Sequence, residues 1–235
     1  MVKLCPYLLS ILMLQAFAYA EADQSTLVSV GSIDYGVMTV AERAGHTYLI
    51  SQDGRFVFDV ASVLDIWTNQ TVRDATAIAR ASKRIPLKNL NMNPSELNVI
   101  ETGIGPTRVD IFIDPQCKFC ALVKKQSRML EQQYTFHWYL LPIFEESKAT
   151  VRMASCRVND PNLVAAFRKD ELESYLQQLE EQACDSDRYD TTLILGDLIG
   201  VTGIPFIVAE NGETHRGAPL DLKGWLAGNR IEQEY

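Results

Sequence analysis

Two cysteines that stand two residues apart, where an apolar strand meets a helix, constrain the fold of this chain most. In the segment TRVDIFIDPQCKFCALVKKQ, an apolar run over about residues 108–113 is followed by a short turn and then by Cys117 and Cys120. The spacing of the residues that follow predicts an amphipathic helix starting at Cys117. Its apolar side is predicted to carry Phe119, Leu122, Val123 and Leu130, and its polar side Lys124, Lys125 and Arg128.

A cysteine at the start of a helix is a candidate nucleophile. The unpaired N–H groups and the helix dipole favour the thiolate of Cys117, and Lys118 adds a neighbouring positive charge. Cys120 lies one turn further in, so we expect it to be more buried and to stay protonated longer. This asymmetry suits a pair in which Cys117 attacks a disulfide and Cys120 resolves the mixed disulfide that forms.

The sequence offers little support for the two competing uses of this cysteine pair. A zinc site needs two more ligands at suitable spacing. The two remaining cysteines of the mature chain, Cys156 and Cys184, are far apart in the sequence. The three histidines form no pair; they are His46, His137 and His215. No bound metal is therefore expected. A purely structural disulfide across two residues would close a very small loop and would constrain the chain little.

Cys156 and Cys184 are predicted to form a structural disulfide. A bond between them would close a loop of about 30 residues, and the chain-entropy model assigns such a loop about 3.5 kcal/mol. A second redox pair is the alternative. The structural interpretation is preferred because neither cysteine stands in a motif of its own.

Residues 1–20 are predicted to be a cleaved signal peptide. Lys3 precedes an apolar core over about residues 8–17, and Ala18-Tyr19-Ala20 places small residues before the cleavage point. The alternative is a membrane anchor, for which the apolar run is short. Cleavage would remove Cys5 and leave four cysteines in an oxidising compartment that permits disulfides.

Charge and length restrict the partners and the number of domains. Asp and Glu number 30 against 22 Lys and Arg, a net charge of −8. This balance argues against nucleic acid and against an anionic membrane surface as partners. A chain of 235 residues accommodates one large domain or two small ones.

The pattern along the chain favours two domains. Residues 21–72 predict a small antiparallel sheet, with Asp53-Gly54 between two β-rich runs, and such a small sheet would gain by pairing with a second copy. Residues 73–97 predict a linker helix; an ordinary surface helix is the alternative. Residues 98–235 predict an α/β domain with a helical insertion at about 146–190, a hairpin turning at Asn211-Gly212 and a closing helix.

Pro205 precedes a β-branched run and therefore stands at the start of a strand. The Ile204-Pro205 bond is a candidate cis peptide, and a trans turn proline is the alternative.

Taken together, these segments resemble the DsbC/DsbG family of thiol:disulfide interchange proteins. FIDPQCKFC is similar to that family's F-x-D-x-x-C-x-x-C segment, TGIPFIV to the stretch around its cis-proline, and TYLISQDGRFVF to the hairpin of its N-terminal domain. The resemblance implies a thioredoxin fold with an inserted helical subdomain, preceded by a small α+β (cystatin-like) dimerisation domain and a helical linker.

The same resemblance implies roles for individual residues and partners. Cys117 would be the nucleophile, Cys120 the resolving cysteine and Pro205 the cis-proline, and Cys156 and Cys184 would form a structural disulfide. No cofactor is implied. The partners would be misfolded or oxidised exported proteins, a second copy bound through the N-terminal domain, and a membrane electron donor of the DsbD type. The compartment would be the periplasm.

The chain departs from this family at two places that bear on redox potential and client choice. Ile204 stands where the family usually has Thr, and Lys118-Phe119 stands where DsbC has Gly-Tyr. The resemblance implies a disulfide isomerase. Three alternatives remain: a DsbG-like reductase of sulfenylated folded proteins, a redox-independent chaperone, and a monomeric oxidase, against which the N-terminal domain argues.

Overall fold

The computed structural model describes residues 27–32, 38–51, 54–90, 92–179 and 187–231. The expected signal peptide at 1–20 lies outside these residues. The chain forms two compact units, one reaching to Val63 and including Val72–Ala79, the other comprising Leu64–Thr71 and Arg80–Tyr235.

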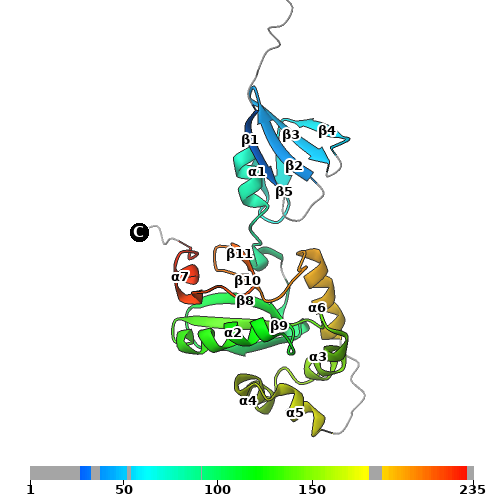
Figure 1. Cartoon of the computed structure of the whole chain (residues 1–235), viewed down its shortest axis with the longest axis vertical. Coiled ribbons are helices and arrows are strands. Elements are labelled where there is room, and N and C mark those ends of the chain that lie inside the picture. Colours follow the sequence, from blue (N-terminus) through cyan, green and yellow to red (C-terminus); the bar gives the residue numbers. More distant parts are fainter. Residues whose placement is uncertain (1–26, 33–37, 52–53, 91, 180–186, 232–235) are drawn as a thin grey trace, which may run out of the picture. The chain divides into compact units, whose positions relative to one another are not determined.

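The first unit is a small antiparallel sheet with one helix. Its four strands lie in the order β1-β2-β3-β4 and span Leu27–Ser32, Met38–Arg43, His46–Ser51 and Val57–Val60. Ala75 and Ile78 of α1 (Ala75–Ala81) form a small buried cluster with Val40 of β2, so the helix covers one face of the sheet (Figure 1). The antiparallel pairing of β3 with β4 confirms the predicted hairpin.

Two proline-containing segments follow α1 and replace a continuous linker helix. Helix α1 ends at Ala81, and only the short 3₁₀ turns η2 (Leu87–Leu90) and η3 (Pro94–Glu96) follow before the next strand. Because a proline ring excludes the preceding residue from helix geometry, Pro86 and Pro94 favour this interrupted course. The backbone N–H of Ile85 donates to the Gly212 carbonyl at 2.7 Å, a bond within the second unit that holds this stretch against the turn between β10 and β11.

The second unit is built on a five-stranded mixed sheet in the order β11-β10-β8-β9-β7. Strands β8 and β9 are parallel and all other neighbours are antiparallel. This order, with a helix connecting β8 to β9 and a hairpin at the other edge, is consistent with a thioredoxin-like fold. The strands span Val99–Thr102 (β7), Thr107–Ile113 (β8), Tyr134–Leu140 (β9), Phe206–Val208 (β10) and Thr214–Arg216 (β11).

Helices cover this sheet and fill the segment between β9 and β10 (Figure 1). In the described part of the chain, most of the predicted helical region is indeed helical. No helix among the described residues is long and apolar enough to cross a membrane. The helices span Lys118–Ser127 (α2), Lys148–Ser155 (α3), Pro161–Lys169 (α4), Leu172–Gln177 (α5), Asp187–Leu198 (α6) and Leu222–Ala227 (α7); short 3₁₀ turns span Arg128–Leu130 (η4) and Glu145–Ser147 (η5).

The core of the second unit follows from the alternation of side chains along β9. Phe136 and Trp138 point to one face, where they join the large buried cluster that also contains both cysteines of the pair. Tyr139 points to the other face, where its ring stacks on Phe112 with centroids 4.4 Å apart. Since both faces of the sheet are covered here, β8 and β9 consist almost entirely of buried residues and their sequences are mostly apolar.

The predicted division of α2 into an apolar and a polar side is wrong in part. Phe119 and Leu122 are 64% and 51% exposed, whereas Cys120 and Val123 are buried. The Lys124 side chain, expected in solvent, is only 12% exposed. The reason lies outside the helix: the helical insertion covers the side that carries Lys124, so its position could not be read from the periodicity of α2 alone.

Candidate functional site

Cys117 is the N-cap residue of α2. Its backbone is extended (φ −77°, ψ 114°), and its Sγ accepts a hydrogen bond from the backbone N–H of Cys120 at 3.3 Å. A sulfur atom therefore takes the place that a serine or aspartate oxygen fills in an ordinary helix cap. Both thiols are free and buried, with 6% of Cys117 and 1% of Cys120 exposed.

The two cysteines lie in different environments. Burial raises the pKa of the Cys120 thiol far above its ordinary value, and its hydrogen bond with Cys117 raises it further. Cys117 lies at the helix end, where the backbone N–H groups are directed. Cys120 is therefore the more buried thiol and the one that keeps its proton, and the attacking role of Cys117 stays a prediction.

Asp114 fixes the turn that leads into the pair. It is fully buried, and its Oδ1 accepts from the backbone N–H of Gln116 at 2.8 Å. Its Oδ2 accepts from the backbone N–H of Phe144 at 3.0 Å and from the Ser147 hydroxyl. One carboxylate therefore joins the cysteine turn to the segment that begins the helical insertion.

The Ile204-Pro205 segment lies against the outer cysteine. The peptide bond between these residues is cis. The Ile204 carbonyl oxygen lies 4.0 Å from the Cys117 Sγ, so the fold brings together two segments that are far apart in the sequence.

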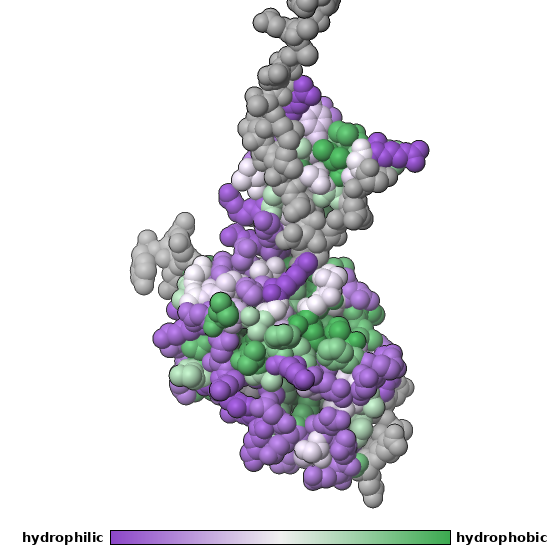
Figure 2. Space-filling model, in the orientation of Figure 1, coloured by the Kyte–Doolittle hydropathy of each residue, from purple (hydrophilic) through white to green (hydrophobic). Residues whose placement is uncertain are grey.

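Lys118 and Phe119, between the cysteines, both point to solvent. Figure 2 shows apolar surface gathered on the visible face of the second unit, where Figure 1 places α2 and α6. Both helices expose large apolar side chains, among them Phe119 and Leu122 of α2 and Ile194 and Leu198 of α6. Exposed apolar surface of this kind marks interaction sites.

Cys156 is disulfide-bonded. It caps the C-terminal end of α3. Its predicted partner, Cys184, lies outside the described residues.

A cavity of about 140 Å³ lies beside the pair, and sequence reasoning missed it. Both thiols line it, together with Lys124 on α2 and with Phe167 and Asp170 from the end of α4. The Lys124 Nζ lies 2.6 Å from the Asp170 Oδ1. No sequence signal pointed to Asp170, because its part in the site depends on how the insertion folds back onto α2.

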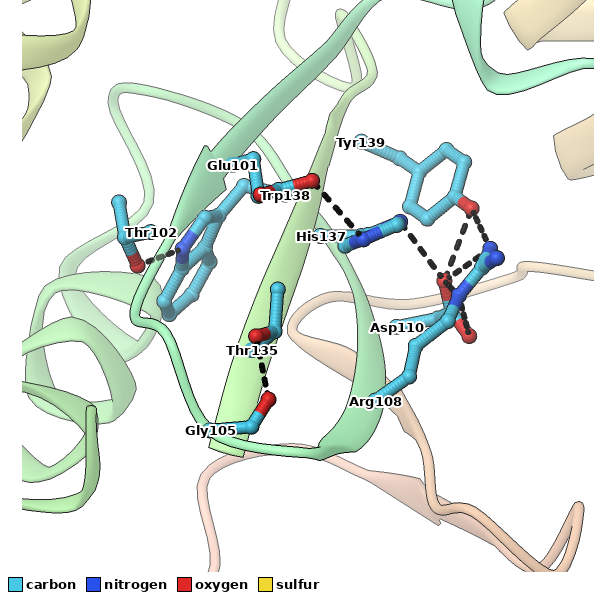
Figure 3. Close-up of polar contacts among 9 residues, drawn as sticks. All are labelled: Glu101, Thr102, Gly105, Arg108, Asp110, Thr135, His137, Trp138 and Tyr139. Carbon is cyan, nitrogen blue, oxygen red and sulfur yellow. Dashed lines mark hydrogen bonds and ion pairs between the residues drawn. The ribbon is translucent and has the colours of Figure 1, made fainter. Parts of the chain in front are cut away.

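A second buried polar cluster lies in the same sheet (Figure 3). Asp110 accepts hydrogen bonds from Arg108 and from the Tyr139 hydroxyl, both at 2.8 Å. The His137 Nε2 lies 3.3 Å from the Glu101 carboxylate, and its Nδ1 is buried without a hydrogen-bond partner. Burial lowers the pKa of His137, and the Arg108 charge lowers it further.

Two further bonds in Figure 3 belong to the same sheet: the Trp138 indole donates to Thr102 and the Thr135 hydroxyl to the Gly105 carbonyl. Among the described residues, no group of three or more His, Cys, Asp and Glu side chains is placed to hold a metal ion.

No protein-family model matches the sequence, and no curated protein does. Several solved structures are similar to part of this chain. A disulfide interchange protein from Neisseria gonorrhoeae is 23% identical, with 60% of this chain and 100% of that chain covered and a TM-score of 0.49. The catalytic domain of Proteus mirabilis ScsC is 18% identical, with 56% and 89% covered and a TM-score of 0.45. Helicobacter pylori DsbG is 14% identical, with 77% and 91% covered and a TM-score of 0.33.

Proposed function

We propose that this protein is a thiol:disulfide oxidoreductase that works as a disulfide isomerase through Cys117 and Cys120. The observation that carries the proposal is the asymmetric pair: Cys117 caps a helix and accepts the N–H of Cys120, whose own thiol is buried and has a raised pKa. A structural disulfide would not require one sulfur to cap a helix beside a second chain segment.

The reaction proceeds by two exchanges. The Cys117 thiolate attacks one sulfur of a client disulfide, forms a mixed disulfide and releases the other client sulfur as a thiolate. That thiolate then attacks other disulfides of the client, and the pairing rearranges. When native pairs have formed, a client thiolate attacks the mixed disulfide and releases Cys117 as a thiolate. Where the client does not rearrange, Cys120 attacks the Cys117 sulfur and releases the client reduced, and the Cys117–Cys120 disulfide must be reduced again.

The surroundings of Cys117 suit an extended client chain. The Ile204 carbonyl beside the sulfur is a hydrogen-bond acceptor for a client backbone N–H. Phe119 next to it is 64% exposed and offers apolar contact. Lys118-Phe119 and Ile204-Pro205 are therefore proposed as the groups that tune the redox potential and choose clients. The exposed apolar surface favours misfolded exported proteins over folded partners.

We further propose a homodimer formed by the N-terminal unit. Strand β4 is an edge of its sheet, since β3 is its only neighbour among the described strands. Its side chains Val57 and Phe58, and the adjacent Phe56, are 59%, 47% and 53% exposed. An exposed apolar edge strand is a template for pairing with another chain. Deleting residues 21–75 should therefore give a monomer in sedimentation experiments, and a deletion variant that still dimerises would move the interface elsewhere.

The remaining parts of the proposal concern the cell. A signal peptide at residues 1–20 would deliver the protein to the periplasm. An isomerase must be kept reduced there, which requires a membrane electron donor of the DsbD type. A Cys156–Cys184 disulfide would stabilise the helical insertion in that oxidising compartment.

The first test is the reactivation of scrambled ribonuclease by the reduced mature protein. Recovery that disappears in Cys117→Ser supports the isomerase. Cys120→Ser should accumulate mixed disulfides with clients, and a variant that traps none would show that Cys117 is not the nucleophile. A pair that cycles with small disulfides but rescues no ribonuclease would point to a reductase of sulfenylated folded proteins. Chaperone activity that survives loss of both cysteines would point to a redox-independent chaperone.

A further inference from the structure

The cavity beside the cysteine pair is enclosed by α2 on one side and the α4–α5 turn on the other. The two thiols line it together with Lys124, Phe167, Asp170 and Glu173. Its volume of about 140 Å³ is enough for several water molecules. A proton leaving the inner thiol therefore has a space to enter that Lys124, Asp170 and Glu173 also line.

Lys124 is held in the wall of this cavity. It lies one turn after Cys120, so both side chains are on the same side of α2. Its Nζ is 2.6 Å from the Asp170 Oδ1 and 4.0 Å from the centroid of the Phe167 ring. An ordinary surface lysine keeps its ammonium in water, whereas the Lys124 side chain is 12% exposed.

The charged groups near Lys124 lie on α2 itself and on the helical insertion that packs against α2. Asp170 faces it from the end of α4, and Arg128, one turn further along the chain, binds the other Asp170 oxygen at 2.7 Å. Glu173 of α5 and the thiol of Cys120 line the same cavity. Burial lowers the pKa of Lys124, and the hydrogen bond that its ammonium donates to Asp170 opposes this. Lys124 therefore releases its proton more readily than a solvated lysine.

Cys120 needs such a group because it must ionise before it attacks. The neighbouring carboxylates are less suited to take its proton. Both oxygens of Asp114 already accept hydrogen bonds from Gln116, Phe144 and Ser147. Glu173 is exposed and therefore solvated.

We propose that Lys124, held by Asp170 and Phe167, accepts the proton of Cys120 when Cys120 resolves a mixed disulfide. This inference rests on the proposed function, and it deepens that function by assigning its proton transfer. Nothing in the motif C-x-x-C itself identifies Lys124, since the role depends on the insertion that closes the cavity.

The step balances within the protein and its client. The Lys124 ammonium, which donates to Asp170, first gives its proton to solvent. Its neutral amine then takes the Cys120 S–H proton through the cavity, and the Cys120 sulfur attacks the Cys117 sulfur. The Cys117–Cys120 bond forms while the bond from Cys117 to the client sulfur breaks, and its electron pair leaves on the client sulfur as a thiolate. In this step the Cys120 sulfur is oxidised and the client sulfur is reduced. Over both exchanges the two protein thiols become a disulfide and the client disulfide becomes two thiols. The Lys124 ammonium then returns its proton to the client thiolate or to solvent.

Ellman's reagent, an aromatic disulfide whose released thiolate absorbs visible light, separates the two exchanges. Attack by Cys117 releases the first aromatic thiolate at a rate that depends on reagent concentration. Resolution by Cys120 releases the second at a rate that does not. The second rate should be measured with the full mature protein from about pH 5 to about pH 10, where the unperturbed Cys and Lys groups span their titrations.

Three variants test the role of Lys124. Lys124→Met keeps much of the stem but removes the amine, and we expect the second rate to fall about a hundredfold near neutral pH, the scale of general base catalysis. That rate should then rise about tenfold per pH unit, because only solvent ionises Cys120. Lys124→Arg should stay slow, since a guanidinium keeps its proton. Lys125→Met, at the exposed neighbouring position, is the matched control and should match the wild type.

The outcomes separate this inference from the proposed function. A Lys124→Met protein with the second rate and pH profile of Lys125→Met would overturn the inference, and so would a Lys124→Arg protein as fast as the wild type. A first rate unchanged in all three variants shows that the fold and Cys117 are intact. If a second release persists in Cys120→Ser, the cysteine assignment itself fails, whatever Lys124 does.

Discussion

Replacing Asp114 tests whether one buried carboxylate holds the cysteine turn in place. Its three hydrogen-bond donors are the backbone N–H groups of Gln116 and Phe144 and the Ser147 hydroxyl. The Phe144 carbonyl lies 2.8 Å from the same hydroxyl, so its single proton keeps an acceptor when Asp114 is removed. The two N–H groups are partly buried and lose theirs. At about 1–2 kcal/mol for each, Asp114→Ala should lower the free energy of unfolding of the second unit by about 2–4 kcal/mol.

Denaturant unfolding followed by tryptophan fluorescence measures this loss, because Trp138 is buried inside the sheet. Asp221→Ala is the matched control: Asp221 caps α7 at an exposed position with a single bond to the Gly224 N–H, and its loss should cost about 1 kcal/mol or less. A loss below about 1 kcal/mol in Asp114→Ala would refute the reasoning. The variant should also slow attack by Cys117 on Ellman's reagent, since the turn before the helix is no longer held.

Three further predictions concern other parts of the molecule. Burial depresses the pKa of His137 in the folded state, so the unfolded chain takes up the proton first and the free energy of unfolding should fall as the pH drops through about 6.5. Denaturant unfolding at several pH values measures this dependence of stability on pH. It should be weaker in His137→Gln but not in the exposed His46→Gln. Gly105→Ala should cost more than about 2 kcal/mol, because its Cβ would lie 2.0 Å from the Gln133 backbone, whereas Gly203→Ala meets nothing within 4 Å and should unfold like the wild type. Phe58→Lys on strand β4 should shift the proposed dimer towards monomer in sedimentation, and an unchanged dimer would exclude that edge as the interface.

Local patterns sufficed to predict the elements that carry the cysteine pair. The apolar run before Cys117, the helix that begins after it and the hairpin at Asn211-Gly212 all depend on short stretches of sequence, and the structure has each of them. The approach of the Ile204 carbonyl to Cys117 was expected only through a family resemblance. It joins residues 87 positions apart, and no local rule specifies such a contact.

The surface of α2 could not be predicted from its own periodicity. Which residues of a helix are buried depends on what packs against it, and the helical insertion packs against the side that carries Lys124. Asp170 takes the left-handed conformation at the end of α4 (φ 64°), from where its carboxylate reaches back to α2. A single aspartate after a helix gives no sequence signal for this contact. The residues that the insertion adds to the site, Phe167 and Asp170, could therefore not be predicted from a motif.

The Lys124–Asp170 pair is better explained by chemistry than by stability. Asp170 is 48% exposed and also binds Arg128, so the pair gains little from its mutual attraction, as is usual for ion pairs open to water. Burying most of the Lys124 side chain beside Phe167 carries a desolvation cost that a hydrophobic residue would avoid. Lys124→Met should therefore change the free energy of unfolding by less than about 1 kcal/mol while slowing resolution by Cys120. A variant that lost several kcal/mol and kept its resolution rate would show instead that the pair serves the fold.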